Sequence, residues 1–131
     1  MTPDLETARR IARHHCDAWT SRNPEAVAAR YAPQPSMAIN GGEPMTSRAE
    51  IADMAAGFMA DFPDLVLTLD QVLVADQHMV YAWTFDGHHR DSGHRVHFSG
   101  WEEWDLDDEL NVTRSLGWYD AADYDRQVAG A

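Results

Sequence analysis

The first part of the chain spaces its apolar residues three and four positions apart, which is typical of a helix with one buried face. One such series predicts a helix over residues 2–20, with the polar His15 on its buried side. Asn23 and Pro24 then provide a cap and a first helical residue for a short second helix over residues 25–31, which the prolines just beyond it end. The first series consists of Leu5, Ala8, Ala12, His15 and Trp19.

A capping box marks the start of a third helix. Ser47 stands three residues before Glu50, the spacing at which each side chain satisfies a backbone donor of the first turn. The helix is expected to end at Phe62, because Pro63 pushes the residue before it out of helical backbone space. Its apolar face consists of Ile51, Met54, Ala55, Phe58 and Phe62.

Beyond residue 64 the hydrophobic period changes to two, the alternation of strands with one buried side. The short polar loop at residues 90–93 contains a glycine and predicts a hairpin. Strands are predicted at residues 36–40, 65–76, 79–89, 95–104 and 111–119, followed by a helical turn at residues 121–128 capped by Asp120. Helices followed by hairpin-linked strands predict an α+β domain, with the helices on one face of a curved antiparallel sheet.

The composition is that of a folded soluble domain, since 131 residues with 44% apolar and 24% charged side chains suffice for one core. A formal net charge of -12 would repel nucleic acid and anionic membranes, so neither is expected as a partner. No apolar stretch approaches the roughly 20 residues of a membrane span, and the first ten residues lack an apolar signal core. These features predict a cytoplasmic protein. The single Cys16 excludes an internal disulfide and is expected to pack as a small apolar side chain.

Short motifs along the chain carry further information. They are Ala18-Trp19, Asn23-Pro24-Glu25-Ala26, Tyr31-Ala32-Pro33, Ser47-Arg48-Ala49-Glu50-Ile51, Phe62-Pro63-Asp64-Leu65, Trp83-Thr84-Phe85, Gly87-His88-His89, Val96-His97-Phe98-Ser99-Gly100 and Trp118-Tyr119-Asp120. In this order they resemble the nuclear transport factor 2-like superfamily, and within it the SnoaL-like polyketide cyclases and ketosteroid isomerase-related proteins. The resemblance runs from about residue 7 to 127 and implies a single SnoaL-like domain over residues 1–131. It implies a cone-shaped, cystatin-like roll, in which three N-terminal helices and a curved, mainly antiparallel sheet enclose an apolar pocket.

Strand alternation then sorts side chains between the two faces of that sheet. If Trp83 faces inward, the next strand turns Glu102 inward as well, and the last strand turns Gly117 inward. Trp101 and Trp118 would lie on the outer face, which suggests a covered surface such as a homodimer interface.

The pocket is expected to bind a small hydrophobic molecule. No glycine-rich nucleotide loop or nucleophile elbow occurs in the chain, so no cofactor is expected. Candidate ligand-binding residues are Trp19, Tyr31, Asn40, Met54, Phe58, Tyr81, Trp83, Phe98 and Tyr119. For each of them, core packing or turn formation is the alternative interpretation.

The resemblance also assigns chemical roles to positions of this chain. It places the base of the steroid isomerases at Ile39, their tyrosine at His15 and their acid at Glu102, and it places the cyclase aspartate at Gly117. Because neither Ile39 nor Gly117 can transfer a proton, His15 and Glu102 remain as the predicted catalytic pair, pointing into the cavity from opposing elements. Such a pair would isomerise, cyclise or dehydrate a small apolar or aromatic carbonyl compound. The alternative is a buried hydrogen bond between the two in a non-catalytic binding or assembly module.

Four histidines near the predicted hairpin raise the question of a metal site. A period of two places His89 and His94 on one face and His88 and His97 on the other, so at most two converge. Because zinc catalysis needs three protein ligands, we expect solvated loop histidines and no metal.

Overall fold

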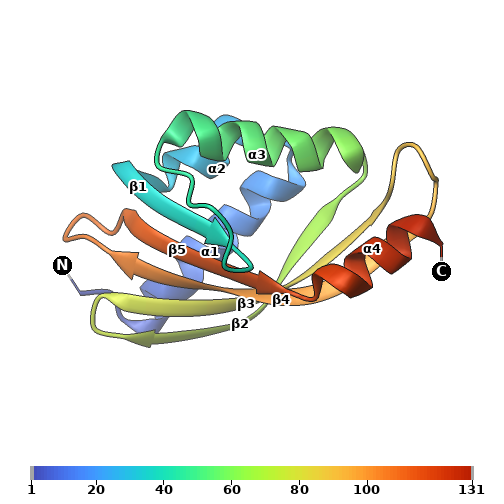
Figure 1. Ribbon diagram of the computed structural model, residues 1–131. Helices are drawn as coiled ribbons and strands as arrows, with labels where there is room; N and C mark the ends of the chain where they lie inside the picture. The colour runs from blue at the N-terminus through green and yellow to red at the C-terminus, as the bar shows by residue number, and fades with distance from the viewer. Residues whose placement is uncertain (1, 131) are drawn as a thin grey trace.

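The computed structural model describes residues 2–130 and shows a curved five-stranded sheet with helices packed against it (Figure 1). In chain order the elements are α1 (Leu5–Thr20), α2 (Pro24–Ala29), β1 (Tyr31–Ile39), α3 (Arg48–Asp61), β2 (Val66–Ala75), β3 (His78–His88), β4 (Arg95–Leu106), β5 (Val112–Tyr119) and α4 (Ala121–Ala129).

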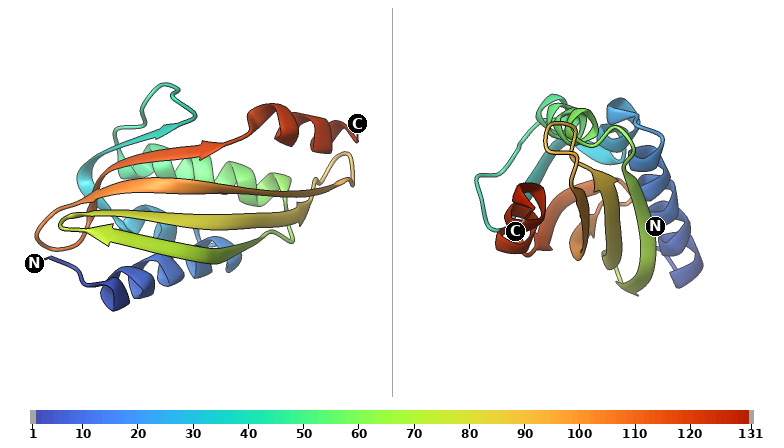
Figure 2. Two further views of the ribbon diagram at one scale, coloured as in Figure 1. Left: turned by 90° about the horizontal axis from the view of Figure 1, so that it is seen from below. Right: turned by 90° about the vertical axis from the view of Figure 1, so that its right-hand side faces the viewer.

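The strands lie in the order β1-β5-β4-β3-β2 across the sheet. β1 runs parallel to β5, and each other neighbouring pair is antiparallel, so the sheet is mainly antiparallel. α1, α2 and α3 lie on one side of the sheet, whereas α4 extends from the end of β5 and packs along β4 (Figures 1 and 2). The predicted α+β roll is confirmed, with its core between the three N-terminal helices and the sheet.

Side-chain caps fix where the helices begin. Ser47 Oγ accepts from the backbone N–H of Glu50 at 3.1 Å, and the Glu50 carboxylate reaches back to the backbone N–H of Thr46 at 3.2 Å, as the capping box predicted. Asp120 caps α4 by accepting from the backbone N–H of Asp123 at 3.0 Å. Among the helices of residues 2–130, none is long and apolar enough to cross a membrane.

The prediction was wrong where α2 meets β1. The second helix ends at Ala29 rather than at residue 31, and the predicted short strand is the second half of a longer one that begins at Tyr31. β1 therefore includes Pro33 and Pro35, which the sequence suggested would lie between elements. An edge strand tolerates proline because one side of its backbone has no partner, and the pairing with β5 shifts register between Tyr31 and Ser36.

The predicted alternation of the long strands is confirmed. In β4 every second side chain from Val96 to Trp104 is buried, including Glu102. The intervening residues face outward, and Trp101 is 45% exposed. The sheet therefore has a core-facing side and a second side that keeps apolar surface in contact with solvent.

One irregularity changes the phase of β2. The pairing with β3 skips Asp70, so that Leu69 lies opposite Trp83 and Gln71 lies opposite Ala82. This bulge reverses the alternation, because an extra residue turns the side chains that follow to the other face. Leu73, which the alternation before the bulge would turn inward, is 59% exposed as a result.

Candidate functional site

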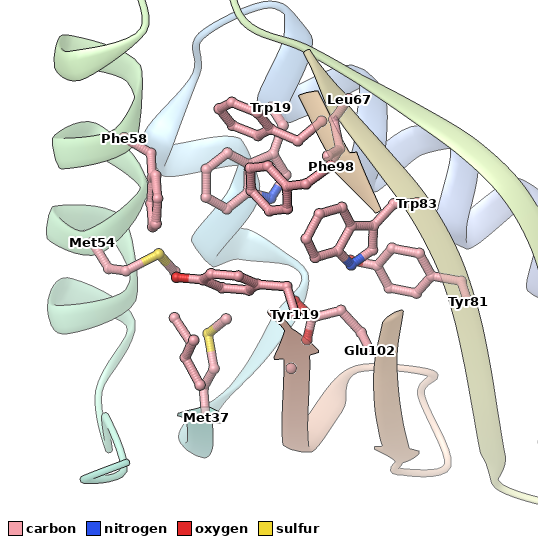
Figure 3. A pocket seen from close by; sticks show the side chains of 13 residues that line it. Trp19, Met37, Met54, Phe58, Leu67, Tyr81, Trp83, Phe98, Glu102 and Tyr119 are labelled. Carbon is pink, nitrogen blue, oxygen red and sulfur yellow. The ribbon is translucent and has the colours of Figure 1, made fainter. Parts of the chain in front are cut away.

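A cavity of about 60 Å³ lies between the helices and the sheet (Figure 3). Its walls come from every element except α2 and α4, and aromatic or aliphatic side chains dominate them. The lining residues are Trp19, Met37, Ile39, Met54, Phe58, Leu67, Tyr81, Trp83, Phe85, Phe98, Glu102, Gly117 and Tyr119. Seven of the nine predicted ligand-binding residues are among them, so strand alternation and helix periodicity located most of the walls.

Glu102 is the single carboxylate among the described lining residues. It is 9% exposed, and Ser115 Oγ donates a hydrogen bond of 2.7 Å to its Oε2 atom. The indole N–H of Trp104 donates in turn to Ser115 Oγ at 3.1 Å. Within residues 2–130 no hydrogen bond reaches Oε1 of Glu102, which leaves that oxygen available to a molecule in the cavity.

The protonation of Glu102 is balanced near neutrality. Burial raises the pKa of its carboxyl to about 7, and the hydrogen bond from Ser115 acts in the opposite direction. Both the neutral and the ionised forms are therefore populated at physiological pH. One side chain can donate a proton to a ligand or accept one from it.

His15 lies behind the cavity rather than on its wall. It is 2% exposed, and its Nε2 atom accepts from the indole N–H of Trp19 at 3.4 Å. Its ring meets Tyr31, Tyr81 and Trp104 edge-on, with centroid distances of 6.1, 6.2 and 5.0 Å. Burial, followed by the positive charge of Arg30, lowers the pKa of His15 to about 3, so the ring is neutral.

The structure does not bring the predicted catalytic pair into contact. In the described part of the chain no hydrogen bond or ion pair joins His15 to Glu102, and Nδ1 of His15 is buried without a partner. Glu102 reaches the cavity and His15 does not. A proton-transfer role for His15 stays a prediction, whereas Glu102 has the position that such a role requires.

Tyr31 and Asn40 also lie outside the cavity wall, for different reasons. Tyr31 is fully buried beneath it, and its hydroxyl donates to Met37 Sδ at 3.5 Å. Asn40 Oδ1 accepts from the backbone N–H of Tyr119 at 2.9 Å and so joins the end of β1 to that of β5. This is the turn role that the sequence left open for Asn40.

Apart from Glu102, which was predicted as catalytic, five lining residues were absent from the predicted ligand-binding set. They are Met37, Ile39, Leu67, Phe85 and Gly117. Ile39 and Gly117 are the positions to which the family resemblance assigned catalytic carboxylates, so the structure places both at the cavity. The inward alternation of β3 and β2 was the signal that could have identified Phe85 and Leu67 as walls.

α4 extends the aromatic wall beyond the cavity. Tyr124 packs against Phe58, Phe98 and Tyr119, with ring centroids 6.4, 5.5 and 5.9 Å away. The helix is held by Gln127, whose side chain accepts from the backbone N–H of His97 at 2.6 Å and donates to its carbonyl at 2.9 Å.

The hairpin histidines have separate surroundings. His88 contacts the carboxylate of Asp64 at 2.7 Å, and Nδ1 of His94 donates to the Val128 carbonyl at 2.8 Å. His97 lies 3.6 Å from Asp86, and the ring of His89 packs on Phe62. Among residues 2–130 no three histidine, cysteine or acidic side chains converge as a metal site would require.

Comparison with known proteins supports the family suggested by the motifs. The sequence model of the SnoaL-like domain family matches residues 12–113, which is most of the chain. The chain therefore belongs to the SnoaL-like domain family, in the nuclear transport factor 2-like superfamily. No curated protein matches it in sequence.

Solved structures share the whole fold at low sequence identity. A protein with a ketosteroid isomerase-like fold from Catenulispora acidiphila, solved in complex with trimethylamine, is 20% identical, with a TM-score of 0.84 over 94% of this chain and 95% of that one. A protein assigned as a SnoaL-like polyketide cyclase from Jannaschia is 13% identical, with a TM-score of 0.84 over 95% and 92% of the two chains. An epoxide hydrolase from M. tuberculosis is also 13% identical, with a TM-score of 0.77 over 98% and 93%. At these identities the likeness defines the fold alone.

Proposed function

We propose that this protein binds a small hydrophobic or aromatic carbonyl compound and transfers a proton on it through Glu102. The observation that carries the proposal is one buried carboxyl in an otherwise apolar cavity, with one oxygen that accepts no hydrogen bond from residues 2–130 and a pKa that burial raises to about 7. Family membership supports an enzyme-like function of this kind, because relatives of the same fold include a protein assigned as a polyketide cyclase and an epoxide hydrolase.

The chemistry follows from the two forms of Glu102. In a ketone whose C=C bond lies one carbon beyond the α-carbon, the ionised carboxylate accepts a proton from that α-carbon, and the resulting neutral carboxyl returns the proton to the far carbon of the C=C bond. One C–H bond breaks and one forms, so the double bond moves and the atoms balance. Because Ile39 and Gly117 hold no acid or base, one carboxyl performs both transfers.

The cavity restricts the size of the ligand. A water molecule needs roughly 10–15 Å³ by the same measure, so about 60 Å³ holds only a few water-sized groups. Met37 lines the cavity from β1 and Met54 lines it from α3, and methionine side chains repack readily around a guest (Figure 3). A single small ring is therefore the largest ligand that we expect without movement of the backbone.

The test is deuterium exchange into 2-cyclohexen-1-one, followed by NMR in heavy water. The wild-type protein should accelerate exchange at the CH2 group next to the carbonyl group, and Glu102→Gln should lower that rate at least about 100-fold. Glu103→Gln is the matched control, because Glu103 is the next residue of β4 and faces the opposite side of the sheet. Equal rates for the wild type and Glu102→Gln would refute the proposal.

A second candidate is a binding protein for small organic cations, and the aromatic walls favour it. Trp19, Trp83 and Tyr119 line the same cavity as the Glu102 carboxylate, aromatic rings attract cations, and no described lining residue carries a positive charge. The Catenulispora relative solved with trimethylamine supports this candidate.

The pH dependence of binding separates the two candidates. A carbonyl oxygen binds best to neutral Glu102, so affinity for cyclohexenone should rise as the pH falls below about 7. An ammonium ion needs ionised Glu102, so affinity for trimethylamine should rise as the pH increases through the same range. Calorimetric titration of both compounds at pH 6 and pH 8 gives the sign directly.

The outer face of the sheet supports a homodimer as the assembled state. Trp101 and Leu73 are 45% and 59% exposed there, and Trp118 lies partly buried on the same face. Light scattering of Trp101→Glu should show a monomer if a second copy covers this face. A wild-type protein that is already monomeric at high concentration would contradict the proposal.

A further inference from the structure

Two residues of β5 form a cradle around the carboxyl of Glu102. Ser115 and Gly117 stand two positions apart and so face the same side of the sheet, toward the cavity. Gly117 lies directly opposite Glu102 in the β4–β5 pairing, and Ser115 lies opposite Trp104. The carboxyl therefore leans from its own strand onto the neighbouring one (Figure 3).

Gly117 has no side chain, and the carboxyl of Glu102 occupies the space beside it. A Cβ atom at this position would lie 3.1 Å from Oε2 of Glu102 and 3.3 Å from both Cδ and Oε1, closer than ordinary van der Waals contact. The backbone does not require glycine there, since Gly117 is not among the residues with positive φ in the described chain. A side chain here would therefore compete with the Glu102 carboxyl for space, whereas the backbone conformation would not oppose it.

Ser115 fixes the orientation of the carboxyl. The hydroxyl has one proton, and Trp104 Nε1 donates to the oxygen at 3.1 Å, so the proton of Ser115 is directed to Oε2 of Glu102 at 2.7 Å. Ser115 and Trp104 are almost completely buried, and water does not compete for these contacts. Oε2 is held by Ser115, and Oε1 accepts no hydrogen bond from residues 2–130.

We propose that Ser115 and Gly117 are positioning residues that hold Glu102 with one oxygen bonded and the other presented to the ligand. The inference rests on the proposed function only in taking Glu102 as the group that meets the ligand. Gly117 is the position on β5 where the family resemblance would place a catalytic aspartate. In this chain β5 instead orients the Glu102 carboxylate of β4.

The arrangement predicts how Glu102 responds to each change. The hydroxyl of Ser115 stabilises the ionised carboxylate, so Ser115→Ala should raise the pKa of Glu102 further. Gly117→Ala should push the carboxyl away from Ser115 and raise the pKa as well. The smaller freedom of alanine in the unfolded chain and the cost of displacing the carboxyl oppose each other, so this variant should stay folded with a melting temperature close to that of the wild type.

The experiment is a carbon-13 NMR titration of protein labelled at the glutamate side-chain carboxyl, with no ligand present. The signal of Glu102 is the one missing from Glu102→Gln. Ser115→Ala should raise its titration midpoint by about one pH unit, a roughly tenfold change in proton affinity. Ser99→Ala is the control and should leave the midpoint unchanged, because the Ser99 hydroxyl lies on the outer face of β4, 2.8 Å from that of Thr84.

Gly117→Ala keeps the inference testable if Ser115→Ala fails to fold once Trp104 Nε1 has lost its acceptor. This variant should raise the midpoint and lower the exchange rate of cyclohexenone at least about tenfold while remaining folded. A folded Gly117→Ala protein with an unchanged midpoint and rate would overturn the inference. Full exchange activity in Glu102→Gln would instead refute the proposed function and leave the cradle standing, so the two failures are distinguishable.

Discussion

The buried carboxyl of Glu102 should make the protein less stable as the pH rises, and Glu102→Gln should remove that loss. The folded state raises the pKa of this group from its ordinary value of 4.5 to about 7, so the folded protein binds the proton more tightly than the unfolded chain. Below pH 4.5 both states are protonated and burial of the group has no electrostatic cost. As the pH rises through 4.5 the unfolded state gains by ionising, and the cost reaches its limit above pH 7.

The size of the effect follows from the same two values. A difference of one pH unit between the folded and unfolded pKa corresponds to about 1.4 kcal/mol. The free energy of unfolding of the wild type, relative to Glu102→Gln, should therefore fall by about 2 kcal/mol between pH 4 and pH 6 and by about 3 kcal/mol by pH 8. Glutamine keeps an acceptor for Ser115 and carries no charge, so its own contribution does not vary over this range.

Urea unfolding of both proteins at one-unit steps from pH 4 to pH 8 measures this difference, because the other titrating groups cancel in the comparison. Glu103→Gln serves as the control, since Glu103 faces away from the cavity and its substitution should give a difference that is nearly constant with pH. A constant difference for Glu102→Gln as well would refute the argument, because it would mean that the carboxyl is as well solvated in the folded state as in the unfolded one.

Three further predictions follow from other parts of the fold. His15 has the opposite pH dependence: its pKa is lowered from 6.5 to about 3, so the wild type should lose stability relative to His15→Gln as the pH falls below 6.5, by about 3 kcal/mol at pH 4 in urea unfolding. Gly100→Ala should lower the melting temperature, at a cost of about 3 kcal/mol, because a Cβ there would collide with the Trp118 carbonyl oxygen and lie 2.7 Å from Cζ2 of Trp83. An unchanged melting temperature would refute this prediction, since it would mean that both the β5 backbone and the indole move aside without cost. Gln127→Ala should speed amide hydrogen exchange in α4 with little change in global stability. Exchange rates in α4 equal to those of the wild type would contradict the role of this side chain in holding the helix.

Local signals predicted much of the fold because they act over a few residues. The capping box at Ser47 and the alternation of β3 and β4 depend on hydrogen bonds and burial within one element, and both were identified from the sequence. The start of β1 was missed, because an edge position that tolerates Pro33 and Pro35 is a property of the sheet and not of the segment. The bulge at Asp70 is likewise visible only in the pairing of β2 with β3.

The candidate site divides in the same way. The alternation of β4 was enough to predict that Glu102 faces inward, since a strand has only two faces. The buried stripe of α1 correctly placed His15 inside the core, but the direction in which a buried side chain reaches depends on the rings around it, here Tyr31, Tyr81 and Trp104. The sequence pattern contains no information about those distances, so the expected contact between His15 and Glu102 could not be checked before the fold was known.

The empty position at Gly117 has a consequence for how this scaffold can be redesigned. Adjacent strands are about 4.8 Å apart, and residues 102 and 117 are direct neighbours across that spacing. The double exchange Glu102→Gly with Gly117→Glu would move the acid from β4 to the neighbouring strand β5, and the pairing of the two strands would be kept. A flat guest held between the same walls would then meet the acid along a different edge, so two reciprocal substitutions could change which carbon of the guest is protonated and from which side. Under the proposed function, the facing positions 102 and 117 would therefore set which carbon of the guest meets the acid, with the carboxyl at one position and no side chain at the other.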